Sequence, residues 1–140
     1  MLNRIQLIGN LADDAIIRTT QSGVRYATFR LITSDETYNK IAGSWEAKTT
    51  GFNVVVWGNL VKYAEKAAMK GRLFVVEAKM KEHRYESDGQ ARYSWQAVVN
   101  DRFGLIRSLT RATESGSQGR YDPSTSDHST TIEGELVEQY

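Results

Sequence analysis

Apolar residues recur at every second position through much of the first hundred residues. In the segment GVRYATFRLITS, Ala27, Phe29 and Leu31 fall on one face, with polar or aromatic residues between them. A period of two residues is typical of a half-buried strand. Strands are therefore predicted at residues 5–11, 24–33, 52–57, 72–85 and 91–99, with a further short piece at 103–108.

One helix is predicted after the third strand. Gly58 breaks that strand, Asn59 is a suitable N-cap, and Gly71 stands where the C′ glycine of a helix belongs. The apolar face of this helix is formed by Leu60, Ala64, Ala67 and Ala68.

The order of these elements predicts an all-β fold. An Asp-Gly turn at residues 87–89 joins the fourth and fifth strands into a hairpin. Three strands, a helix and two further strands follow the order of the OB-fold. This fold is a five-stranded Greek-key barrel, partly open, whose helix lies between strands three and four.

Composition changes near residue 108. Residues 1–110 carry 16 Lys and Arg against 11 Asp and Glu, a balance of +5, whereas residues 111–140 carry 2 against 6, a balance of −4. The second segment is rich in Ser, Thr, Gly and charge, and it cannot bury enough apolar surface to fold. The sequence therefore predicts an OB-fold domain at 1–108 and a disordered acidic tail at 109–140.

Catalytic and metal chemistry find little support in the sequence. The chain has no cysteine, its two histidines, His83 and His128, are far apart, and no phosphate-binding loop is present. No apolar run is long enough to span a bilayer. We therefore expect no catalytic residues, metal site or cofactor, no membrane association, and a cytoplasmic protein that is not an enzyme.

Aromatic and cationic residues share faces of the predicted strands. Alternation places Val54 and Val56 in the core and turns Trp57 outward. On the fourth strand Tyr85 shares a polar, cationic row with Lys81. Such a mixture suits single-stranded nucleic acid, because bases stack on aromatic rings and phosphates bind Lys and Arg.

Further aromatic residues lie outside these two strands. The segment between strands two and three, residues 34–51, is predicted to be a long polar loop that carries Tyr38, Lys40 and Trp45. Aromatic rings in a polar loop have little core to pack against, so base stacking is the favoured interpretation. Tyr93 and Trp95 remain open between ligand contact and a packing or subunit-contact role.

Four segments in order resemble a known family. LNRIQLIGNLADD, SGVRYATFRLITSDE, VVVWGNLVKYAEKAAMKG and DGQARYSWQAVV are similar to the bacterial and mitochondrial single-stranded DNA-binding proteins, the SSB family, over about residues 2–107. The resemblance implies a homotetramer of OB-folds that wraps single-stranded DNA without sequence preference in replication, recombination and repair. It also implies a disordered C-terminal tail that recruits replication or repair proteins or competes with DNA.

The resemblance also implies DNA-binding positions. Together with Trp45 from the loop, the predicted DNA-binding residues are Arg4, Arg18, Tyr38, Lys40, Trp45, Trp57, Lys70, Lys81, Arg84 and Tyr85. The chain departs from the family pattern at Gly51, Asn53 and Asn59, where the family has a tryptophan, an arginine and a lysine. Its last residues, ELVEQY, keep acids and an aromatic residue but lack the family's closing proline and phenylalanine.

A second hypothesis uses the same residues differently. Exposed Tyr and Trp are also enriched in protein–protein interfaces. The alternative is therefore an OB-fold interaction module, such as a primosome-like accessory protein, that binds nucleic acid weakly.

Overall fold

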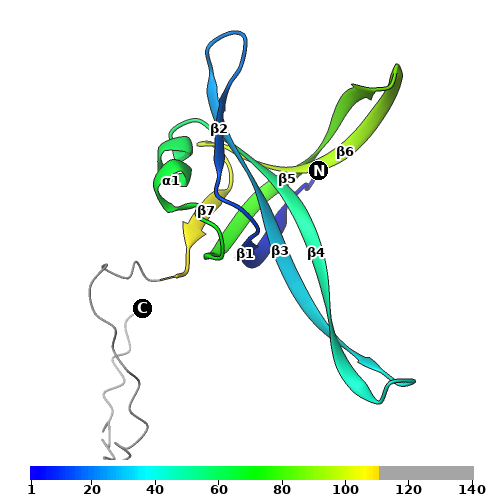
Figure 1. Cartoon of the computed structure of the whole chain (residues 1–140). Coiled ribbons are helices and arrows are strands. Elements are labelled where there is room, and N and C mark those ends of the chain that lie inside the picture. The colour runs from blue at the N-terminus through cyan, green and yellow to red at the C-terminus, as the bar shows by residue number, and fades with distance from the viewer. Residues whose placement is uncertain (111–140) are drawn as a thin grey trace, which may run out of the picture.

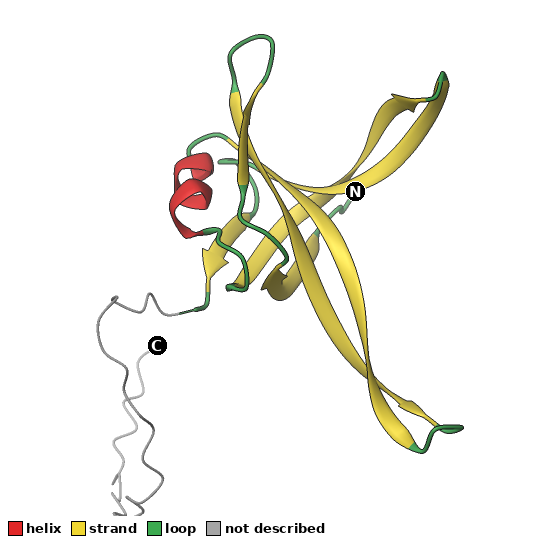
Figure 2. Ribbon diagram, in the orientation of Figure 1, coloured by secondary structure: helices red, strands yellow, loops and turns green. Residues whose placement is uncertain are grey.

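The computed structural model describes residues 1–110 of the 140-residue chain. The acidic tail predicted at residues 109–140 lies almost wholly outside the described residues. The described part forms seven strands and one helix (Figures 1 and 2): β1 Ile5–Leu11, β2 Ile16–Thr19, β3 Arg25–Asn39, β4 Ser44–Trp57, α1 Leu60–Ala67, β5 Leu73–Ser87, β6 Gln90–Val99 and β7 Leu105–Ser108.

Five strands close into a barrel. Strand pairing runs from β1 to β3, β4, β6 and β5, and β5 pairs back with β1. All of these pairs are antiparallel except β4 with β6, which is parallel. With α1 between β4 and β5, this is the OB-fold arrangement that the sequence predicts, and the prediction is confirmed. Strand β2, a short strand that pairs with the first part of β3, was not predicted from the sequence.

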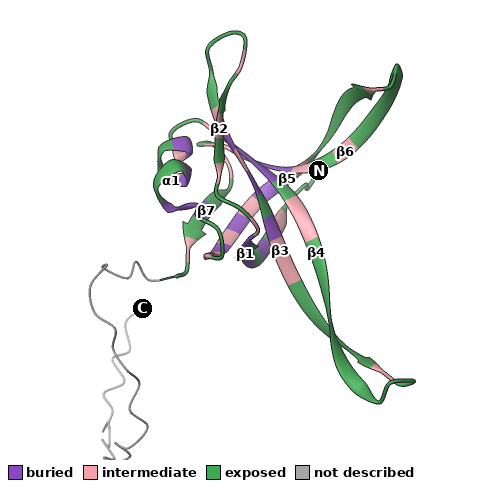
Figure 3. Cartoon of the chain, in the orientation of Figure 1, coloured by how far each residue is buried: buried purple, intermediate pink, exposed green. Residues whose placement is uncertain are grey.

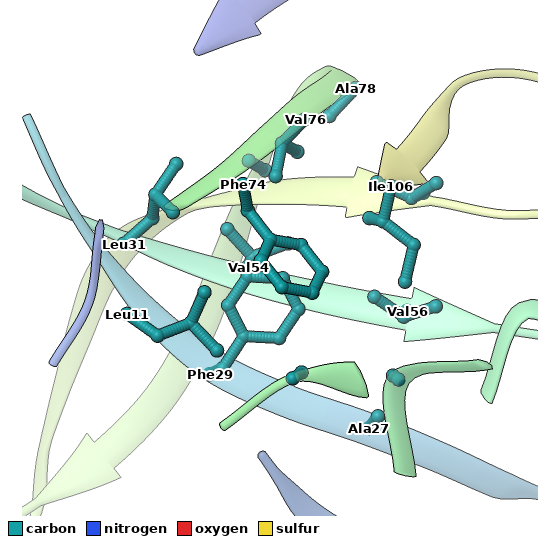
Figure 4. Close-up of a cluster of buried hydrophobic side chains, with 14 of the residues drawn as sticks. Leu11, Ala27, Phe29, Leu31, Val54, Val56, Phe74, Val76, Ala78 and Ile106 are labelled. Carbon is teal, nitrogen blue, oxygen red and sulfur yellow. The ribbon is translucent and has the colours of Figure 1, made fainter. Parts of the chain in front are cut away.

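The barrel interior is filled by alternate residues of the long strands (Figure 4). Phe74, Val54 and Val56 are fully buried, as alternation on β4 and β5 predicts. The rings of Phe29 and Phe74 contact each other at a centroid distance of 6.1 Å. Because side chains on a strand alternate between faces, every buried position here fixes an outward-facing neighbour.

The β3–β4 hairpin is the largest departure from the sequence prediction. Residues 34–51 are not a loop: β3 and β4 pair without interruption from Tyr26 with Trp57 to Asn39 with Ser44. The outer half of this hairpin is exposed and projects from the barrel (Figures 1 and 3). Its backbone groups are paired along the ladder, so the strands extend without an apolar face.

The β5–β6 hairpin is a second projection from the barrel (Figure 1). Its pairing runs from Lys79 with Val98 to Ser87 with Gln90. The turn residues Asp88 and Gly89 have φ values of 54° and 73°. Positive φ at both central residues is the requirement of a type I′ hairpin turn, so the predicted Asp-Gly turn is present.

The helix forms where the sequence predicts it, but its ends differ. The side chain of Asn59 makes no capping bond. Instead, the Asn59 amide donates to the carboxylate of Asp101 at 2.9 Å. Gly71 lies beyond the C-cap, Ala68, and its amide donates to the carbonyl of Leu11, so it shapes the connection to β5.

The apolar face of α1 covers one end of the barrel. Val61, Ala64 and Ala67 are its buried residues, whereas Leu60 is only partly buried. The Tyr63 hydroxyl accepts a hydrogen bond from the Ser108 amide at 2.8 Å, which joins the helix to β7. In residues 1–110 no helix has the length and apolar character needed to cross a membrane.

Candidate nucleic-acid interface

A groove of about 560 Å³ lies between the β2–β3–β4 sheet and the β5–β6 hairpin. Most of its lining comes from outward-facing residues of the barrel strands, and two acids come from the link between β1 and β2. The lining includes Asp13, Asp14, Ile16, Arg18, Thr20, Tyr26, Thr28, Arg30, Asn53, Val55, Trp57, His83 and Gln96.

Strand register explains why these residues meet. Tyr26 pairs with Trp57, Thr28 with Val55 and Arg30 with Asn53, so successive outward positions of β3 and β4 stand side by side. Strand β2 adds a third row, in which Arg18 lies opposite Tyr26. The face opposite the core is therefore built by the same alternation that builds the core.

Trp57 lies on this outer face, as its sequence position predicts. Its ring stacks on that of Tyr26 with centroids 4.7 Å apart and an interplanar angle of 26°. Trp57 is partly buried, and both rings line the groove. A flat, partly buried aromatic surface beside Arg18 offers stacking and positive charge at one place.

The β5–β6 hairpin divides the predicted residues of β5 between two faces. Lys81 and Tyr85 share a face with His83, whose ring lies nearly parallel to that of Tyr85 at 6.4 Å. Arg92 of β6 stands directly opposite Tyr85 on this face. Arg84 lies on the other face, opposite Tyr93. The structure therefore brings Lys81 and Tyr85 together but not Arg84.

The outer end of the β3–β4 hairpin carries a second aromatic pair. Tyr38 and Trp45 are register partners, and their rings meet edge to face at 5.5 Å. They are 48% and 67% exposed, too open to belong to a core. Lys40 follows in the turn. The unbroken alternation places this pair on the same ribbon face as Tyr26 and Trp57, about 40 Å away along the strand.

Arg4 stands apart from the groove. It forms an ion pair with Glu77 of β5. Hydrogen bonds from Arg4 and then from Gln6 hold the pKa of the Glu77 carboxyl below its usual value of 4.5. The guanidinium of Arg4 is therefore already engaged by an acid on the barrel surface.

Lys70 lies near the rim of the groove. It follows the end of α1, and its side chain is exposed. Its backbone amide donates to the carboxylate of Asp14 at 2.7 Å. Because Asp14 itself lines the groove, this bond fixes the position of the Lys70 backbone beside the groove entrance.

Several residues of this surface were not predicted from the sequence. Tyr26, Arg30, His83 and Gln96 line the groove but were not among the predicted positions. Alternation alone already turns Tyr26 and Arg30 away from the core, so that signal was present in the sequence. Within residues 1–110 no group of three or more acidic or histidine side chains is placed to hold a metal ion.

The barrel, the aromatic groove and the two projecting hairpins define an OB-fold protein with an open binding face. The model of the single-strand binding protein family matches residues 2–105. The chain therefore belongs to that family, and the family prediction is confirmed.

Two individual similarities agree with this assignment. The chain is 27% identical over 119 residues to single-stranded DNA-binding protein 2 of Streptomyces coelicolor, covering 83% of this chain and 60% of that protein. The chain thus spans about three-fifths of that relative's length. It also resembles a Plasmodium falciparum SSB in complex with ssDNA, with a TM-score of 0.70 and 24% identity over 79% of this chain and 96% of that one. This second likeness supports the fold.

Proposed function

We propose that this chain binds single-stranded DNA without sequence preference and protects it during replication, recombination and repair. The observation that carries the proposal is the stacked pair of Tyr26 and Trp57, which lines an open groove beside Arg18 and Arg30. Membership of the single-strand binding family and the names of the two similar proteins support it.

The groove can bind a nucleic-acid strand through two independent effects. A base that stacks on the Trp57 ring contributes roughly 1–3 kcal/mol whatever its identity, because every base has a flat π-face. Arginine and lysine side chains neutralise phosphates, and the counterions that they release favour binding. Neither effect reads the sequence of bases, which agrees with the proposed lack of preference.

The proposed path of the strand joins the groove to both hairpins. From Trp57, Arg18 and Lys70 one arm continues along β3–β4 to the outer aromatic pair, and the other passes over the outward face of β5–β6. Arg84 would contact a DNA strand that crosses the edge of this hairpin. Arg4 contributes least, because Glu77 already neutralises it. The proposed contacts are Arg4, Arg18, Tyr38, Lys40, Trp45, Trp57, Lys70, Lys81, Arg84 and Tyr85.

Assembly as a homotetramer is part of the proposal. In the described chain, residues 5–9 of β1 pair only with β5, so their other edge is open for pairing. Ile8 is 59% exposed and Leu105 is 40% exposed, on strands that flank β5. Light scattering coupled to size exclusion would measure the mass of the assembly, and a monomer or a dimer would contradict this part.

We propose a cytoplasmic, nucleoid-associated protein that acts by binding rather than by catalysis. Replication or repair proteins are its proposed partners through the residues after 110, which carry six acids. Deletion of residues 111–140 tests this point, because it should abolish partner binding while DNA binding by the domain at 1–108 persists.

The decisive experiment is a fluorescence titration of the full chain with oligo-dT. We expect tryptophan quenching that weakens with salt, and little response to duplex DNA of the same length. Trp57→Ala should weaken binding about 5- to 150-fold, the range given by loss of one stacked base. Absence of quenching and of a gel shift at low salt would refute the proposal. A stable protein partner with unchanged DNA binding in Trp57→Ala would favour the interaction-module alternative.

A further inference from the structure

Near the middle of the β3–β4 ribbon, the guanidinium of Arg30 occupies the space that a side chain at position 51 would fill. A Cβ atom added to Gly51 would fall against the Nη2, Cζ and Nε atoms of Arg30. The Arg30 side chain therefore crosses from β3 and lies over the backbone of β4. Gly51 is opposite Ile32, so Arg30 reaches its diagonal neighbour rather than its direct partner.

A hydrogen bond holds this arrangement in place. The Nη1 atom of Arg30 donates to Oδ1 of Asn53, its direct register partner, at 3.1 Å. Arg30 is exposed, and within residues 1–110 the two ion pairs involve other arginines, Arg4 and Arg25. The guanidinium is thus positioned by a neutral side chain while its charge is left without an acid partner in the described chain.

The position of Arg30 along the ribbon places its guanidinium between two aromatic pairs. By alternation Arg30 lies on the same face as the Tyr26–Trp57 pair and the Tyr38–Trp45 pair, between the two. It also lines the groove. Arginine planes stack on nucleobases much as aromatic rings do, and they add a cation to the contact.

We propose that Arg30, laid over Gly51, is a base-stacking platform of this chain that links the groove to the outer aromatic pair. The inference rests on the proposed function and adds a subsite to it, whose ligand is one unpaired nucleobase and its adjoining phosphate. Gly51 is the permissive partner, because any side chain there would occupy the place of the guanidinium.

Three substitutions in the full chain separate a platform from a simple charge. Arg30→Lys keeps the charge and removes the plane. Gly51→Ala keeps Arg30 but displaces its guanidinium, and the backbone accepts it because φ at Gly51 is not positive. Arg30→Ala removes both. The matched control is Arg25→Ala on the same strand, which lies on the other face and pairs with Glu65 at 3.3 Å.

The readout is oligo-dT affinity and its salt dependence. We expect Arg30→Lys and Gly51→Ala to bind about fivefold more weakly, with unchanged salt slope. Arg30→Ala should lose at least as much affinity and also lower the slope by about 0.7. Arg25→Ala should match the wild type. Circular dichroism melting tests whether each variant is folded. If Gly51→Ala is unfolded, Asn53→Ala, which removes the hydrogen bond to the guanidinium, replaces it as the displacement variant.

Two different failures are distinguishable. If the wild type does not bind oligo-dT, the proposed function fails and this inference falls with it. If the wild type binds and both Arg30→Lys and the folded displacement variant bind equally well, the function stands and the platform is overturned. Arg30 would then act as a charge alone.

Discussion

The β3–β4 and β5–β6 hairpins, which both project from the barrel, differ in how they combine rings and charges. The groove-side face of the outer β3–β4 hairpin carries Tyr38 and Trp45, and its other members by alternation include Glu36 but neither Lys nor Arg within residues 34–38 and 45–49. The outward face of the β5–β6 hairpin carries Tyr85 among Lys81, His83 and Arg92.

Because of this difference, the two hairpins should bind DNA through different physical effects, base stacking on one and phosphate neutralisation on the other. Stacking on exposed rings depends little on ionic strength, whereas phosphate neutralisation weakens as salt rises. The outer aromatic pair of the β3–β4 hairpin should therefore supply affinity that survives in high salt. The β5–β6 hairpin should supply most of the salt dependence. Substitutions on each hairpin can test this division directly.

The largest effect is expected from the cationic hairpin. The double substitution Lys81→Ala and Arg92→Ala should lower affinity about tenfold to a hundredfold at low salt and reduce the salt slope by about 1.4, near 0.7 for each lost phosphate contact. Titrations with oligo-dT at several salt concentrations would measure both quantities. An unchanged slope would show that these cations do not contact the strand.

A smaller effect is expected from the aromatic hairpin. Trp45→Ala should weaken binding roughly fivefold, near the lower end of the stacking range, because the ring is exposed at the hairpin end. The salt slope should remain that of the wild type. If the salt slope of Trp45→Ala falls as far as that of the cationic double variant, the proposed difference between the two hairpins is wrong.

A third substitution tests whether the face matters as well as the residue type. Trp95 is 61% exposed, but it lies opposite Glu82 on the face of β5–β6 that continues the barrel interior. Trp95→Ala should therefore change oligo-dT affinity less than about twofold, well below the effect of losing a stacked base. A loss as large as that of Trp45→Ala would place DNA on both faces of the hairpin.

The smallest effect is expected on the barrel, outside both hairpins. Because Arg4 and Gln6 lower the pKa of Glu77 in the folded protein, this carboxylate stabilises the fold above its usual pKa of 4.5. That contribution disappears as the pH falls through the lower folded-state pKa. Glu77→Gln should therefore flatten the acid side of the stability curve, as thermal unfolding between about pH 3 and 6 would measure.

The barrel was predictable because its signals are local. Alternation at Val54 and Val56 identifies the core face and turns Trp57 outward, and Asp88 with Gly89 specifies its turn. The outer β3–β4 hairpin was not predictable in this way. Residues 34–39 show no apolar alternation, and their strand is defined by pairing with a partner strand.

The site was only partly predictable for a related reason. The outward direction of Trp57 follows from its own strand, but its stacking partner Tyr26 follows from the register between two strands. Arg84 carries the same charge as Lys81, yet the alternation of β5 sends it to the other face. The carboxylate that meets the start of α1 belongs to Asp101, 42 residues beyond Asn59, where no local motif could indicate it.

The unbroken pairing of β3 with β4 also constrains which insertions this hairpin can accept. A one-residue insertion in each strand between the inner and outer aromatic pairs would keep Tyr38 beside Trp45 but turn both rings to the opposite side of the ribbon. Insertions of two residues per strand would keep all the rings aligned. Functional variants of this hairpin should therefore differ in length by four residues at a time.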